Sequence, residues 1–82
     1  MWFKGLRYGD VVNAIAKTGL VPRQVTSGAP FIVGIFDRDN EVGYMVVYPW
    51  SSGEWTVTLV IYDEYVENPK VRALLSNINV KP

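Results

Sequence analysis

The sequence predicts an α+β fold in which a three-stranded antiparallel meander lies between two helices, in the order α-β-β-β-α, with a fourth short edge strand as a variant. Two observations lead to this prediction. Three runs rich in β-branched and aromatic residues are separated by turn sequences, which is the pattern of consecutive antiparallel strands. The segments on either side repeat apolar residues at helical spacing, between helix start and stop signals.

The composition favours a single domain, residues 1–82, and argues against an enzyme. Hydrophobic residues make up 49% of the 82 residues, which is enough for a core, and no stretch has the composition of a linker. Cys and His are both absent, which excludes thiolate zinc sites, cysteine nucleophiles and histidine-based catalysis. Eight basic and eight acidic residues cancel, so no net charge attracts nucleic acid or anionic lipid. We therefore expect a cytoplasmic protein with no catalytic residues, metal, cofactor or membrane segment.

The first helix is expected over 11–18. Asp10 is a good N-cap, Gly19 stands at the expected C′ position, and Val12 and Ile15 fall on one face. Because two turns of helix are marginal alone, this helix must pack on the sheet.

The segment 20–30 contains two prolines and a glycine among polar residues, so we expect an extended connection or a short edge strand at 24–26. Turns are predicted at 37–41 and 51–53. The three strands of the meander are placed at 31–36, 42–48 and 55–62.

The last helix begins at Asn68, an N-cap residue, with Pro69 at the first helical position, where its missing N–H does no harm. It runs to about Asn77, with Asn77 and Asn79 as stop residues. One apolar stripe is expected from Val71, Leu74, Leu75 and Ile78.

Two groups of acidic residues are candidates for a metal or catalytic site. Asp37, Asp39 and Glu41 alternate along the first hairpin turn, and their oxygens would suit a hard cation. The segment lacks the glycine and the distant glutamate of a calcium loop, and Asp and Asn are ordinary turn formers. We interpret it as a structural turn. A second acidic group, at 63–67, precedes the last helix, where it complements the helix dipole.

The predicted element order resembles that of double-stranded RNA-binding domains, and a three-stranded meander between two helices also resembles SH2 domains. The RNA-binding family carries a basic cluster at the start of its last helix, where this chain has 68–72 preceded by acidic residues. SH2 domains often begin near a motif similar to Trp2-Phe3-Lys4-Gly5, but they place a phosphate-binding arginine where this chain has 31–34. We assign no family, because neither resemblance extends beyond element order and a few residues.

Aromatic residues supply the candidate binding site. Trp50 follows a proline at an expected turn, where the ring should be exposed, and exposed aromatic rings are enriched at interfaces. In the third strand Val57 and Ile61 mark the core face, yet neither side of the middle strand is cleanly polar. The second face of the sheet is expected to expose Met45, Val47, Val60 and Tyr62. The expected partner-binding residues are Trp50, Tyr48, Tyr62, Val60 and Met45.

These residues predict a small protein-binding or assembly module, such as an inhibitor, adaptor or structural accessory. Its partner is another protein, and a homodimer through the second face or free edge of the sheet is expected. In the monomeric alternative, segment 20–30 or Trp2-Phe3 covers that face. Because the unit is so small and self-contained, we also expect a virus, phage or mobile element as its source. Two other functions stay open: a small-molecule binder with an aromatic pocket, and a nucleic-acid-binding regulator that uses Trp50, Trp55, Tyr48, Arg38 and Arg23.

Overall fold

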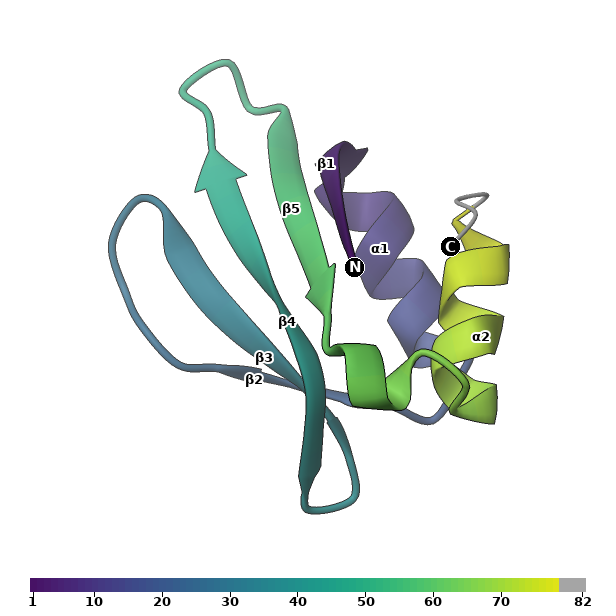
Figure 1. Ribbon diagram of the computed structural model, residues 1–82. Coiled ribbons are helices and arrows are strands. Elements are labelled where there is room, and N and C mark those ends of the chain that lie inside the picture. Colours follow the sequence, from purple (N-terminus) through teal and green to yellow (C-terminus); the bar gives the residue numbers. More distant parts are fainter. Residues whose placement is uncertain (79–82) are drawn as a thin grey trace.

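Within residues 1–78 the chain forms one antiparallel sheet of five strands, with two α-helices on the same side of that sheet (Figure 1). A computed structural model describes residues 1–78. The elements, in chain order, are β1 (Trp2–Arg7), α1 (Tyr8–Ala16), β2 (Val21–Gln24), β3 (Phe31–Asp37), β4 (Asn40–Pro49), β5 (Trp55–Ile61), the 3-10 helix η1 (Asp63–Tyr65) and α2 (Pro69–Asn77).

The strand order in the sheet is β1-β5-β4-β3-β2. The last four strands follow one another as neighbours, while β1 comes from the beginning of the chain and pairs with the last strand. The helix α1 connects the two edge strands, β1 and β2, across one face. The sheet is strongly twisted, and α1 and α2 lie side by side against it (Figure 1).

The predicted order α-β-β-β-α is therefore wrong. The three central strands lie where they were expected, within three residues at each end, but strands are added at both edges. The edge strand expected at 24–26 is β2, three residues earlier. The strand β1 was missed because its partner residues lie 49 to 58 positions away along the chain and because a bulge at Gly5 interrupts its alternation. There Gly5 has φ +72°, a conformation that suits glycine.

Both boundaries of the first helix differ from the prediction. The helix α1 begins at Tyr8, so Asp10 is not the N-cap; it lies in the first turn, where its charge favours the helix dipole. Arg7 occupies the N-cap position without a side-chain capping bond. The helix ends at Ala16, two residues before the predicted end, and Lys17 is its C-cap. Gly19, with φ +83°, lies in the turn that follows and not at the C′ position.

The start of α2 is confirmed in detail. The Asn68 side chain accepts hydrogen bonds from the backbone N–H groups of Lys70 and Val71, and Pro69 is the first helical residue. The end of α2 at Asn77 is also confirmed, whereas Asn79 lies outside the described residues.

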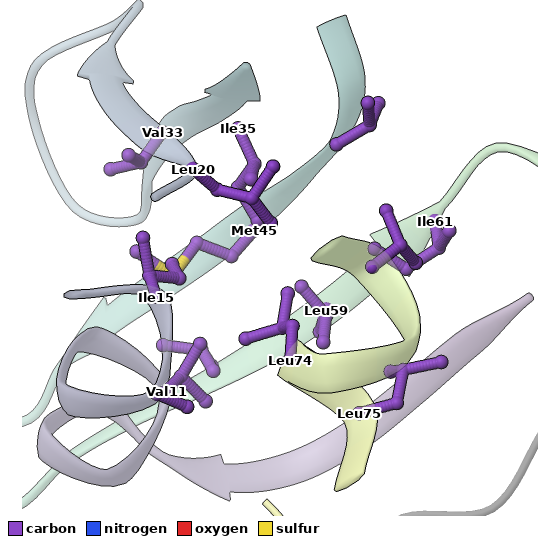
Figure 2. Packing of buried hydrophobic residues seen from close by; sticks show 14 of the residues in the cluster. Val11, Ile15, Leu20, Val33, Ile35, Met45, Leu59, Ile61, Leu74 and Leu75 are labelled. Atoms are coloured by element: carbon purple, nitrogen blue, oxygen red, sulfur yellow. The ribbon is translucent and has the colours of Figure 1, made fainter. Parts of the chain in front are cut away.

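The core lies between the two helices and one face of the sheet (Figure 2). Met45 extends from β4 toward Ile15 of α1, and Leu74 of α2 lies over Leu59 of β5 (Figure 2). The expectation that Met45 and Val47 lie on the second face is wrong, because both pair with core residues of β5 and are at most 1% exposed. The fully buried large side chains are Ile15, Ile35, Met45, Leu59, Ile61, Leu74, Val11, Val42, Val47, Val57 and Val71.

Candidate functional site

The face of the sheet that carries no helix is the candidate functional site, and we call it the open face. Strand register assigns its side chains, because residues paired directly across antiparallel strands point to the same side. Within residues 1–78, no helix packs against this face. Its members are Trp2, Lys4, Arg7, Val21, Arg23, Ile32, Phe36, Glu41, Tyr44, Val46, Tyr48, Thr56, Thr58, Val60 and Tyr62.

The centre of the open face is uncharged. Ile32, Val46 and Thr58 form one row across β3, β4 and β5, and Tyr44 and Val60 belong to the next row. All five side chains are partly exposed. In the monomeric alternative, segment 20–30 or Trp2-Phe3 would cover this face. Residues 21–24 instead extend the sheet sideways as β2 and Trp2-Phe3 does so in β1, so the apolar centre stays uncovered in the described chain.

An aromatic pair occupies one end of the open face. The rings of Tyr48 and Trp50 stack with centroids 5.8 Å apart and an interplanar angle of 12°. The indole N–H of Trp50 donates to Thr56 Oγ1 at 2.9 Å, which folds the ring back toward the sheet. Trp50 is still 54% exposed. Next to this pair is a small apolar pocket of about 130 Å³, lined by Ala29, Pro30, Tyr48, Pro49 and Trp50.

The opposite end of the open face is tied by a polar contact. The Tyr62 hydroxyl donates a hydrogen bond to the Glu41 carboxylate, and the ring of Tyr62 lies against Tyr44 with centroids 6.0 Å apart. The hydrogen bond to Glu41, together with burial and the negative charge of that carboxylate, raises the pKa of Tyr62 to about 12. Glu41 is thus engaged by a neighbouring side chain.

The cations of the open face lie at its two edges. Lys4 and Arg7 are on β1, and Arg23 is on β2; neither edge strand contains an acidic residue. Lys4 Nζ lies 4.7 Å from the ring centre of Trp2, and the Arg23 guanidinium lies 4.9 Å from that of Phe36. None of the three cations forms an ion pair within residues 1–78.

The two sheet edges are poorly suited to pairing with another strand. The strand β2 has only four residues, and Pro22 has no N–H to donate. The bulge at Gly5 distorts β1, and Lys4 stands beside it. The sheet therefore offers its face more readily than its edges.

Four of the five predicted partner-binding residues belong to this surface: Tyr48, Val60 and Tyr62 on the open face and Trp50 at its end. Met45 does not, because it is in the core. Tyr44 and Val46, its neighbours along β4, occupy the open face instead. The sequence held a signal for the side of β4 that they occupy, because tyrosine hydroxyls favour a surface with access to water. Trp2, Lys4 and Arg7 were missed together with β1.

The residues proposed for nucleic-acid binding do not form one surface. Trp55 points to the helix side, where its ring contacts Tyr8 and Phe31 edge-on, at centroid distances of 5.2 and 6.0 Å. Arg38 is in the β3–β4 turn, at the other end of β4 from Tyr48. The strand between them is about 30 Å long, so these groups cannot act as one compact platform.

The acidic residues Asp37 and Glu41 of the predicted turn point to different sides of the sheet. The Asp37 carboxylate accepts hydrogen bonds from Lys70 Nζ at 2.8 Å and from the Asn68 side chain at 3.0 Å, on the helix side. These bonds hold the pKa of Asp37 below its ordinary value. Glu41 points to the open face. Within the described residues no three acidic side chains converge as metal ligands.

A second pocket, of about 320 Å³, lies between the two helices on the far side from the open face. Its polar lining includes Asp10, Asn13, Lys17 and Asn77. For these groups the structure shows no mutual hydrogen bond or ion pair within residues 1–78 that would organise a site.

Over residues 1–78 no helix is long and apolar enough to cross a membrane. Comparisons with known protein families, with curated proteins and with solved structures find no match to this chain.

Proposed function

We propose that this protein is a small, non-enzymatic protein-binding or assembly module that contacts its partner through the open face. The observation that carries the proposal is the uncharged centre of that face, formed by Ile32, Val46 and Val60 and left uncovered in the described chain. An apolar centre with charges at its rim is the usual arrangement of a protein interface. An uncovered apolar sheet face is also a feature that monomers normally avoid.

The aromatic end of the face supplies an anchor point. Trp50 and Tyr48 belong to the residue types that dominate binding energy at interfaces, and they border the small apolar pocket. A partner side chain that entered this pocket would bury part of the exposed indole. The blunted edges of β1 and β2 favour such contact with the face over addition of a strand.

Site-specific photocrosslinking tests this proposal. Tyr48 is replaced with a benzophenone-bearing phenylalanine in the cell that produces the protein, and crosslinked species are identified by mass spectrometry. The matched control places the same group at Tyr65, which packs on the helix side of the sheet. We expect discrete protein adducts from the Tyr48 position and none of these from Tyr65.

A second variant shows whether the adducts depend on the open face. Val46→Lys introduces a charge at the centre of the patch, so it should abolish the adducts while the melting temperature stays close to that of the parent protein. Equal adducts from both positions, or adducts that survive Val46→Lys, would reject the open face as the binding surface.

A further inference from the structure

The distribution of charge around the open face indicates the chemistry of its partner. The edge strand β1 contributes Lys4 and Arg7, and the edge strand β2 contributes Arg23. Among the residues of 1–78 that form this face, Glu41 is the acidic one, and it accepts a hydrogen bond from Tyr62. A chain with no net charge therefore presents a face with an excess of cations.

We propose that the partner is an acidic polypeptide segment that inserts an aliphatic or prolyl side chain into the pocket beside Trp50 and places carboxylates against Arg7 and Lys4. This inference rests on the proposed function. The pocket is apolar, borders two prolines and a stacked aromatic pair, and has room for one aliphatic side chain. Prolyl and aliphatic residues on extended segments are commonly recognised by such aromatic surfaces.

The register sets the spacing between anchor and charge. Tyr48 on β4 pairs with Thr56 on β5, which pairs with Arg7 on β1. Arg7 is thus two strand spacings, or about 10 Å, from Tyr48, which borders the pocket. An extended segment covers that distance in about three residues. The expected ligand carries carboxylates two to four residues from its apolar anchor.

A second copy of this chain fits the charge pattern less well. Two open faces related by a twofold axis along or across the strands would place basic edge opposite basic edge, and like charges oppose association. Single-stranded nucleic acid would need free ring faces for stacking. On this surface Trp2 lies under Lys4, Phe36 lies under Arg23, and the central row of Ile32, Val46 and Thr58 contains no aromatic ring.

The test uses the full chain labelled with ¹⁵N and three peptides that share a Pro-Leu-Pro centre. The acidic peptide is Glu-Asp-Glu-Pro-Leu-Pro-Glu-Asp, and the neutral and basic peptides replace its flanks with Gln-Asn and Lys-Arg residues. The three indole N–H signals distinguish the two sides of the sheet, because Trp50 and Trp2 are on the open-face side while Trp55 is on the helix side. We expect the acidic peptide to shift the Trp50 signal most and to leave Trp55 unchanged, with binding that weakens as salt rises.

Charge variants complete the design. Combined Lys4→Gln and Arg7→Gln should weaken acidic-peptide binding about tenfold, whereas Lys17→Gln, at the C-cap of α1 and away from this face, should leave it unchanged. Equal binding of the basic peptide, no binding of the acidic peptide, or shifts dominated by Trp55 would overturn the proposal. Tighter binding of single-stranded oligodeoxythymidine would replace the acidic segment with a nucleic-acid ligand. A doubled mass of the free protein, with chemical-shift changes at the same residues, would replace it with self-association. If the Tyr48 crosslinks capture a protein but the acidic peptide does not bind, the proposed function stands and this inference fails.

Discussion

The two faces of one sheet differ in what their side chains stabilise. On the helix side, Met45 and Leu59 pair across strands and are covered by the helices until they are at most 1% exposed. On the open face, the neighbouring pair Tyr44 and Val60 stays partly exposed. Residues of similar hydrophobicity thus contribute to folding on one side and remain accessible to a partner on the other.

This difference separates stability from binding in a way that mutations can test. The buried side chains on the helix side form one cluster between the helices and the sheet, so removal of a large one leaves a cavity. An open-face side chain borders solvent, so its removal leaves no enclosed cavity. The predictions below compare the two faces, beginning with the largest expected effect.

Leu74→Ala should lower the free energy of unfolding by about 3 kcal/mol, because Leu74 is fully buried where α2 meets the sheet. Its matched control, Val46→Ala on the open face, should cost less than about 1 kcal/mol. Chemical denaturation measures both. Similar losses for the two variants would show that the open face is covered by the protein itself.

The two strand glycines give a second comparison. A methyl group at Gly43 would lie 2.2 Å from the carbonyl oxygen of Val60, which is backbone and cannot move freely, so Gly43→Ala should destabilise by about 2 kcal/mol. At Gly34 it would meet the ring of Phe36 at 2.8 Å and the Glu41 carboxylate at 3.0 Å, both on movable side chains. Gly34→Ala should therefore cost under about 1 kcal/mol. Thermal unfolding ranks the two, and the reverse order would contradict this account.

Asn68→Ala should lower the free energy of unfolding by about 1 kcal/mol, because it removes the cap from the backbone N–H groups of Lys70 and Val71. It also removes one hydrogen bond to Asp37. Asn68→Asp keeps an acceptor at the cap but loses the donor to Asp37 and brings two carboxylates together. Urea denaturation should place Asn68→Ser, which keeps only the cap, closest to the parent protein.

The smallest effect concerns the open-face contact between Tyr62 and Glu41. The pKa of Tyr62 is raised to about 12, so stability from this hydrogen bond is fully present below the ordinary pKa of 10.0 and is lost as pH rises through about 12. Glu41→Gln should return the pKa of Tyr62 toward 10.0. Ring carbon chemical shifts of Tyr62 followed through a pH titration measure the change, and identical midpoints in both proteins would remove Glu41 as its cause.

Local chemistry in the sequence determined much of the fold. The cap at Asn68, the proline that follows it and the apolar stripe of α2 act within a few residues, so they could be recognised without the rest of the chain. The same holds for the three central strands and for the turn between β3 and β4, where Arg38 adopts φ +58°. Trp50 was also placed correctly at an exposed position, since a proline and a turn surround it.

Only the tertiary structure decided which strands lie at the edges and which face each residue of β4 occupies. The strand β1 is the first along the chain and β5 is the last, and no local pattern in the sequence indicates that they pair. Because side chains alternate with a period of two, the parity of β4 follows from its register with β5, and that register placed Met45 in the core and Val46 on the open face. The pairing of β1 with β5 also places the cations Lys4 and Arg7 in the candidate site.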